Sequence, residues 1–441
     1  MPHPTVRGYV LLGVAAATYL AARLVGTWEL YLFAFAFLAI VVLAWLSVAA
    51  TGRRIRATRT ITPEQPVAGD EPEMSFSLKN ASFLPGPELT LRSPLVGLST
   101  DDLEFEVGSL APRGERAIKT HVARVNRGVH VLPATEARAE DPMGIARSVH
   151  KVSDTLVVTV LPRITPLDSC ALFPDLGLKH DWSGRHGLRA FGASEFRGVR
   201  PHQPGEPLSH IDWKSTAKTG ILMLREMEEP AGADVTMLLD GTAARLVGRL
   251  PETNFELAVR AVGSVADYVL RSHRGVSLLC HERNWRQVRL TADGGGRRAL
   301  LQVLAETRPD AAAPLVSALR RLRKDGSYQL RAQSITLVGI SLDQELASTL
   351  IRLREDGGRL AFLYIDGTSF APGVAEGSSA LLPFLPAAQQ PGTTLSTEDR
   401  SLLLSLSAAG IPCLTIARGD DLVRTLTLWR PGHTGRAAAA K

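Results

Sequence analysis

Residues 235–242, VTMLLDGT, form a short apolar run that ends in an acidic residue, a glycine and a hydroxyl residue. A continuous apolar run of this length is typical of a strand buried on both faces, as in a parallel sheet. Such a strand places its last residue, Asp240, at the carboxyl edge of the sheet, where α/β proteins bind ligands. The stretch therefore predicts an α/β domain and marks the edge where a site is expected.

The chain after this stretch alternates between helical and strand patterns. Apolar residues at helical spacing predict a helix over residues 255–270. Further strands are predicted at 276–280, 335–339, 360–365 and 413–416, and further helices at 297–305, 314–323, 345–354, 398–408 and 422–428. Strands that alternate with helices indicate a mainly parallel, doubly wound sheet. Residues 366–394, rich in Gly, Pro, Ala and Ser, are interpreted as an insertion.

Upstream, residues 61–162 carry a different pattern, in which apolar and polar residues alternate. Met74, Phe76 and Leu78, for example, are separated by single serines. This period of two, with turn signals between the runs, predicts short strands of a small antiparallel β-sandwich. No catalytic grouping stands out there, so we expect a structural or binding module.

Two apolar stretches, residues 9–25 and 28–50, precede the β region. The second is long enough to cross a bilayer as a helix, and the first is at the short end of the spanning range of roughly 17–25 residues. Gly26 and Thr27 predict a turn between them, so a transmembrane helical hairpin is expected. The alternative is that residues 1–25 are a signal peptide.

The arginines around the hairpin predict its orientation. Arg53, Arg54, Arg56 and Arg59 follow the second stretch, whereas only Arg23 stands near the turn. Because the cytoplasmic flanks of membrane helices are rich in Lys and Arg, both ends of the hairpin and the soluble domains are expected in the cytoplasm.

The composition limits the classes of function. A chain of 441 residues is long enough for two or three domains. The net charge is +6, but the basic residues are spread along the chain and form no nucleic-acid-binding signature. A basic surface near an anionic membrane explains the charge better. Cys170, Cys280 and Cys413 are too far apart for a zinc site and odd in number, so buried thiols are expected.

Residues 192–229, GASEFRGVRPHQPGEPLSHIDWKSTAKTGILMLREMEE, join the β and α/β regions. His210, Asp212 and Ser215 suggest a hydrolase site. However, three residues within six positions rarely converge as nucleophile, base and orienting group. The chain also has no Gly-x-Ser-x-Gly motif of a nucleophile elbow.

A structural cluster is the favoured interpretation of the same segment. Asp212 would cap a helical turn that begins at Trp213, and Lys214 and Lys218 would share one face at four-residue spacing. The Trp213 ring would be buried with its indole N–H paired. Residues 221–225 are predicted to form a strand.

Two sets of motifs resemble one known family. Residues 204–229 are similar to the Pro-Gly-Asp, Ile-Asp/His-Trp-Lys-x-Ser/Thr-Ala and Arg-Glu-x-Glu pattern of the bacterial domain-of-unknown-function-58 family. Residues 108–118 (GSLAPRGERAI), 126–133 (NRGVHVLP) and 140–147 (EDPMGIAR) resemble the markers of its β domain. The chain departs from the pattern at Pro201, His202, Glu206 and Ser209.

The resemblance implies a membrane hairpin, a β domain and a von Willebrand A-like domain in a non-enzymatic partner of MoxR-type AAA ATPases. Carried onto this chain, the family motif implies interaction positions at Arg200, Gly205, Ile211, Asp212, Trp213, Lys214, Ala217, Lys218, Arg225 and Glu226.

The resemblance also raises the question of a metal-ion-dependent adhesion site, whose Asp-x-Ser-x-Ser motif supplies oxygen ligands for Mg²⁺. Asp240 and Thr242 keep the acid and one hydroxyl, but Ala244 has no donor oxygen. Ser341 or Asp343 could contribute from a later strand. The competing interpretation is that Asp240 caps a helix or satisfies the strand end.

The expected organisation is a hairpin, a β-sandwich, a junction, a von Willebrand A-like domain and a tail, at residues 1–52, 53–165, 166–230, 231–430 and 431–441. The favoured hypothesis is a membrane-anchored, non-enzymatic interaction protein that binds a MoxR-type AAA ATPase and no nucleic acid. The alternatives are a Mg²⁺-dependent ligand-binding module and a membrane-bound hydrolase of envelope precursors. Mg²⁺ is the one cofactor considered.

Overall fold

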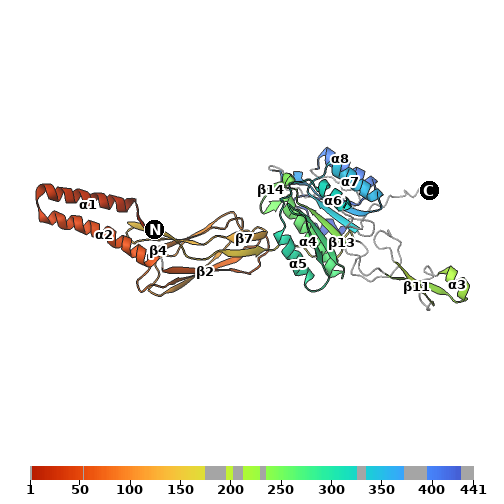
Figure 1. The fold of residues 1–441 in the computed structure, drawn as a ribbon, viewed down its shortest axis with the longest axis horizontal. Coiled ribbons are helices and arrows are strands. Elements are labelled where there is room, and N and C mark those ends of the chain that lie inside the picture. Colours follow the sequence, from red (N-terminus) through yellow and green to blue (C-terminus); the bar gives the residue numbers. More distant parts are fainter. Residues whose placement is uncertain are drawn as a thin grey trace, which may run out of the picture. The chain divides into compact units, whose positions relative to one another are not determined.

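The structure is a computed structural model that describes residues 2–52, 54–173, 195–201, 212–228, 235–324, 334–371 and 395–428. Two compact units divide the chain, Met1–Arg163 and Ile164–Lys441. The first holds the helical hairpin and the β domain, and the second holds the junction and the α/β domain (Figure 1).

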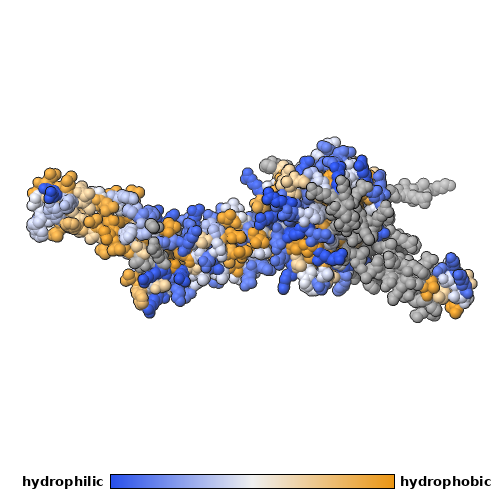
Figure 2. All heavy atoms as spheres, viewed as in Figure 1, coloured by the Kyte–Doolittle hydropathy of each residue, from blue (hydrophilic) through white to orange (hydrophobic). Residues whose placement is uncertain are grey.

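The hairpin consists of α1 (Val6–Val25) and α2 (Trp28–Gly52), with Gly26 in a left-handed conformation at the turn. Both helices are long and apolar enough to cross a membrane, and only 17% of each apolar window is buried. Figure 2 shows hydrophobic atoms, in orange, gathered along the hairpin. A helix that is apolar all round is either buried in protein or faces lipid. The exposure of α1 and α2 therefore favours lipid.

The first residues of the chain are built into the folded unit. Strand β1 (His3–Pro4) pairs with β9 (Ala146–Lys151), and the Thr5 amide donates to the Ile145 carbonyl at 2.8 Å. The Trp45 indole donates to the Pro2 carbonyl at 3.2 Å. Removal of a signal peptide would take away a strand of this sheet, so the structure argues against that alternative.

The β domain contains antiparallel sheets around one core. One sheet has the order β1-β9-β8-β4-β5, a second has the order β2-β3-β6, and β7 pairs with β10. The remaining strands are β2 (Ile55–Thr62), β3 (Glu73–Asn80), β4 (Glu88–Ser93), β5 (Leu103–Glu106), β6 (Glu115–His121), β7 (Gly128–Leu132), β8 (Glu136–Glu140) and β10 (Leu156–Val160). Val48 of α2 belongs to the same core as Phe76 and Leu91, so the helix and the β domain pack as one body.

Arg59 corrects one step of the orientation argument. Alternate residues of β2 face the core, and this places Arg59 inside with 7% of its surface exposed. Its guanidinium donates to Leu132 O at 2.8 Å, to Asp154 O at 3.1 Å, and to the hydroxyls of Ser93 and Thr135 at 3.3 and 3.4 Å. Burial lowers the pKa of Arg59. It is a core residue rather than a membrane-flanking charge.

The two arginines nearest to α2 in the described part of the chain lie at the surface. Arg54 and Arg56 are exposed, and Arg54 directly precedes β2. Their charge is therefore available at the base of the hairpin, and the orientation stays a prediction.

The α/β domain has one six-stranded sheet in the order β17-β16-β13-β18-β19-β20, in which β17 alone is antiparallel. Its strands are β13 (Val235–Asp240), β16 (Val276–His281), β17 (Arg286–Leu290), β18 (Ser334–Gly339), β19 (Arg359–Ile365) and β20 (Cys413–Ile416). The helices are α4 (Asn254–Arg271), α5 (Gly296–Glu306), α6 (Leu315–Lys324), α7 (Gln344–Glu355), α8 (Thr397–Ala408) and α9 (Leu422–Leu428). This doubly wound sheet with an antiparallel edge strand is von Willebrand A-like, and the predicted fold class is confirmed.

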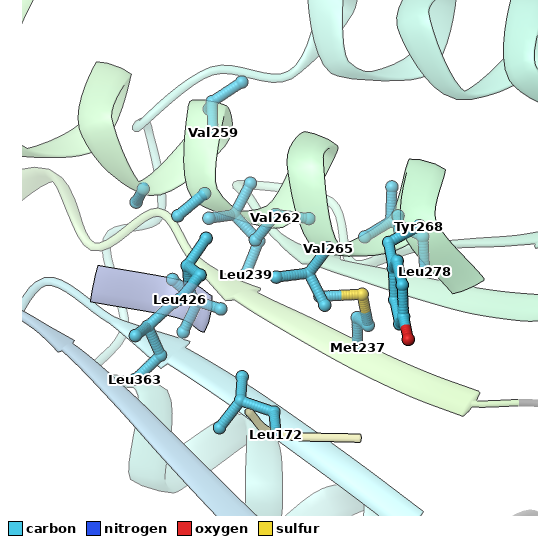
Figure 3. Close-up of a cluster of buried hydrophobic side chains, with 14 of the residues drawn as sticks. Leu172, Met237, Leu239, Val259, Val262, Val265, Tyr268, Leu278, Leu363 and Leu426 are labelled. Atoms are coloured by element: carbon cyan, nitrogen blue, oxygen red, sulfur yellow. The ribbon is translucent and has the colours of Figure 1, made fainter. Parts of the chain in front are cut away.

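The helices cover the sheet on both faces. Helices α4, α5 and α9 share one core cluster with the sheet, and α6, α7 and α8 share the other. In Figure 3, Val262 and Val265 of α4 point toward Leu239 and Met237 of β13. Burial on both faces explains why the sequences of the parallel strands are mostly apolar.

All three cysteines are buried. Burial raises the pKa of Cys170 to about 11 and that of Cys413 to about 12. The thiols of Cys170 and Cys413 are therefore protonated at neutral pH and poorly nucleophilic, as expected for structural cysteines.

Substituting Arg59 tests its role in the core. Arg59→Ala leaves two carbonyls and two hydroxyls without their donor, so the free energy of unfolding should fall by about 3 kcal/mol. Thermal unfolding of the detergent-solubilised chain, followed by the far-UV signal of the sheets, measures this. Arg56→Ala, at an exposed position of the same strand, is the control and should leave the melting temperature within a degree or two. Equal effects of the two substitutions would contradict the assignment.

Candidate functional site

Asp240 ends the central strand β13 and is fully buried. Its Oδ1 accepts hydrogen bonds from Thr242 N at 3.0 Å and Thr242 Oγ1 at 2.6 Å, and lies 3.4 Å from His281 Nδ1. Its Oδ2 accepts from Ser341 Oγ at 3.0 Å and from Ile340 N at 3.4 Å. A buried carboxylate needs such donors. The contacts consequently tie the ends of β16 and β18 to the end of β13.

His281 is a member of this cluster that the sequence analysis missed. It ends β16 in direct register with Asp240, and its ring lies 6.1 Å from that of Trp285. The signal was present, because residues 276–281 are an apolar run that ends in a polar residue, the same feature that marked Asp240.

Gly241 is required by close packing. A Cβ at this position would collide with the carbonyl oxygen of His281 and approach that of Arg308 to 3.2 Å. The backbone of Gly241 and Ala243 also bonds to Ala311 in both directions. The Asp-Gly-Thr turn is therefore covered by neighbouring backbone.

The chain contains a second Asp-Gly-Thr sequence at the end of another buried strand. Asp366 follows β19, and its Oδ1 accepts from Thr368 N at 2.9 Å and from Thr368 Oγ1 at 2.6 Å. These distances nearly equal those between Asp240 and Thr242. The aspartate–threonine pairing thus serves as a general way to close a buried strand in this domain, which favours the structural interpretation of Asp240.

Tyr364, near the end of β19, donates from its hydroxyl to Asp399 Oδ2 at 3.3 Å. Burial, followed by the negative charges of Asp399 and Asp366, raises the pKa of Tyr364. The phenol remains protonated and acts as a hydrogen-bond donor between β19 and α8.

Asp240, Thr242 and Ser341 are the residues that could hold a hard cation such as Mg²⁺, through one carboxylate and two hydroxyl oxygens. Both hydroxyls donate to Asp240 in the structure, so they would have to rotate to present lone pairs to a metal. Asp343 does not join, because its Oδ1 accepts from Leu346 N at 2.8 Å and caps α7. Within the described ranges, no group of three or more His, Cys, Asp or Glu side chains is arranged to hold a metal.

The junction forms a strand–helix–strand unit of β11 (Glu195–Pro201), α3 (Trp213–Thr219) and β12 (Met223–Glu228), with β11 and β12 antiparallel. Asp212 caps α3 as predicted, with Oδ1 accepting from Lys214 N at 3.2 Å. Met223 N donates to Thr216 Oγ1 at 2.9 Å, so α3 is tied to the start of β12. The second strand begins two residues later than predicted.

Trp213 is 67% exposed, so the prediction of a buried ring is wrong. Helix α3 has seven residues and no buried side chain. Its described contacts with β12 are the hydrogen bonds of Met223 to Thr216 and Asp212. Ile221 and Leu222, which follow the helix, are also exposed, at 60% and 42%.

The other motif residues fall into two groups. Lys214, Ala217 and Lys218 are exposed on α3. Arg200, Arg225 and Glu226 lie on the paired strands, where Arg225 is opposite Val199 and Glu226 is opposite Gly198. Gly205, Ile211 and His210 lie outside the described residues.

The suggested hydrolase grouping is only partly described. Ser215 Oγ donates to Asp212 Oδ2 at 3.2 Å. A serine that donates to an N-capping aspartate completes a local turn, and this contact assigns Ser215 a structural role.

The model of the family described as "Protein of unknown function DUF58" matches residues 198–358, in agreement with the resemblance found in the sequence. The uncharacterized protein YeaD of Bacillus subtilis is 24% identical over 365 residues, covering 79% of this chain and 85% of that protein.

Two solved structures are also similar. The SpRpn10 VWA domain is 13% identical, covers 46% of this chain and all of that domain, and has a TM-score of 0.31. An aerotolerance-related membrane protein from Bacteroides fragilis is 11% identical, covers 44% of this chain and 94% of that one, and has a TM-score of 0.28.

Two substitutions separate the structural role of Asp240 from a role in metal binding. Asp240→Ala removes the acceptor of a buried cluster and should lower the free energy of unfolding by about 3 kcal/mol, whereas Asp240→Asn keeps one acceptor oxygen and should cost about 1 kcal/mol. Thermal unfolding with and without Mg²⁺ measures both. Asp366→Ala, at the matching turn, should resemble Asp240→Ala. Stabilisation of the native chain by Mg²⁺ that Asp240→Asn abolishes would show that the metal role dominates.

Proposed function

We propose that this chain is a membrane-anchored, non-enzymatic interaction protein whose soluble domains lie in the cytoplasm and bind a MoxR-type AAA ATPase. A membrane-associated protein with a von Willebrand A-like domain is the part that the fold and the family match support. The partner, the orientation and the absence of catalysis are the further steps of the proposal.

The observation that carries the proposal is the exposed apolar surface on the family motif. Trp213, Ile221 and Leu222 expose large side chains beside Lys214 and Lys218. An exposed tryptophan with apolar neighbours is typical of the centre of a protein interface. The two lysines would be complementary to acidic residues around a partner's apolar pocket.

The orientation is supported by the cations at the hairpin base. Arg54 and Arg56 follow α2, and both are exposed. Non-enzymatic action is supported by the engagement of the candidate catalytic groups: Ser215 and Asp212 bond to each other, and Asp240 is enclosed by its donors.

Co-purification with crosslinking tests the partner. The tagged chain in detergent should recover an AAA ATPase, and Trp213→Ala should reduce recovery about tenfold or more, because interface tryptophans contribute about 2 kcal/mol or more. Its melting temperature should not change, since the ring is exposed. Leu404→Ala, at an exposed apolar position of α8, is the control and should recover the ATPase normally. Repeated preparations without an ATPase would overturn the proposal.

A Mg²⁺-dependent ligand-binding module is the second candidate, favoured by the convergence of Thr242 and Ser341 on Asp240. The same co-purification in EDTA distinguishes the two. Indifference to the chelator is expected, because both hydroxyls already satisfy the carboxylate. The second candidate would be favoured instead if EDTA abolished recovery of the partner, Mg²⁺ restored that recovery, and the Asp240→Asn variant showed no such response.

A further inference from the structure

One end of the β domain gathers the loops that lie nearest to the membrane hairpin. The pairing of Ile55 with Asn80 and of Lys79 with Glu115 brings the corresponding ends of β2, β3 and β6 together. Ala81 N donates to the carbonyl of Arg54, which directly follows the hairpin, at 3.0 Å. The loop after β3 is therefore held at the exit of α2.

A second loop lies at the start of α1. The turn between β8 and β9 accepts a hydrogen bond from the Thr5 hydroxyl at Gly144, and the Thr5 amide bonds to Ile145. Thr5 is the N-cap of α1. Each membrane helix thus has one loop of the β domain bound beside its base.

Both loops expose large apolar side chains. Phe83 and Leu84 are 68% and 57% exposed in the loop beside α2, and Met143 is 64% exposed in the turn beside α1. Single exposed apolar residues are ordinary on protein surfaces. Here three of them lie together on the two loops that flank the hairpin, where they would meet the surface of a membrane.

Cations accompany these side chains. The Arg113 guanidinium lies 4.2 Å from the centre of the Phe83 ring, and Arg54 is exposed next to the loop. Arg56 and Lys79 face each other across β2 and β3, with Glu115 opposite Lys79 on β6. Like charges placed directly opposite cost stability. An anionic surface would offset that cost.

The depth of the loops fits a lipid surface. The apolar stretch of α2 ends at Ala50, four residues before Arg54. At about 1.5 Å per residue this is roughly 6 Å, similar to the headgroup layer of roughly 5–8 Å on each side of the hydrocarbon. Because Val48 is part of the β-domain core, this depth is set by rigid packing.

We propose that this face of the β domain binds the headgroup layer of an anionic phospholipid bilayer, with apolar side chains inserted and basic ones paired to phosphates. It consists of Phe83, Leu84, Met143, Arg54, Lys79 and Arg113. The proposal rests on the membrane anchoring in the proposed function and is independent of the ATPase partner. It makes the β domain a second membrane contact, which holds the domain at a set height and tilt.

Site-specific labelling of the full chain tests the proposal. Leu84→Cys and Met143→Cys are labelled with an environment-sensitive fluorophore, and the native thiols are protected because they are buried. Val96→Cys is the matched control: Val96 is 65% exposed and follows β4 at the end opposite the start of that strand, which the Leu84 loop precedes. The proteins are reconstituted into phosphatidylcholine vesicles with or without phosphatidylglycerol, containing lipids brominated near the headgroup.

The labels on Leu84→Cys and Met143→Cys should shift to the blue and be quenched, whereas that on Val96→Cys should not. Phosphatidylglycerol should increase the quenching about twofold, because an anionic surface attracts the basic residues of the face. Flotation of the chain with the vesicles reports anchoring separately. If the chain floats but the Leu84→Cys label behaves like the control, the lipid-binding face is refuted. If the chain does not float, membrane anchoring and the proposal fail together.

Discussion

The buried carboxylate of Asp240 is the constraint on which the α/β domain depends. A charge at the end of the central strand is tolerated only when donors surround it, and here they come from its own turn, from β16 and from the loop after β18. Meeting that requirement aligns three strand ends at one edge of the sheet. The edge that could have held a metal is consequently held together by hydrogen bonds.

The sequence predicted the elements whose burial is uniform. Residues 235–239 and 413–416 are apolar apart from Thr236 and Thr415, because both faces of the sheet are covered, so their pattern can be recognised without tertiary information. Strand β17 was missed because it is the edge strand, and RQVRL alternates polar and apolar residues too briefly to stand out. The prediction that Trp213 is buried was wrong for a different reason. An indole ring favours burial, but the seven-residue helix α3 has no buried side chain and so offers no core. His281 was missed although it ends a mostly apolar run, and its contact with Asp240 follows from the register of β16 against β13.

Arg59 shows how an orientation prediction based on charge can include a misassigned residue. Because it belongs to an arginine cluster after an apolar helix, Arg59 resembles a residue that sets membrane topology. Its position on the inward side of β2 instead lets its guanidinium donate hydrogen bonds to four acceptors. The period of two in β2, which is visible in the sequence, would have assigned it inside, since Ile55, Ala57 and Ile61 share its face. Charge counting and strand periodicity must therefore be applied to the same residues before either is trusted.

The packing of α2 into the β-domain core changes what the hairpin can do. A flexible tether would let the soluble domains sample many heights above the bilayer. It would only raise the local concentration of these domains near the membrane. Here Val48 lies in the core and the N-terminal strand joins a sheet, so a bilayer that held the hairpin would orient the β domain directly. The proposed lipid contacts of its loops would then need little additional ordering, because the packing sets their height. A rigidly oriented β domain would suit the interaction role proposed for this chain, because it would fix the height at which a partner is met.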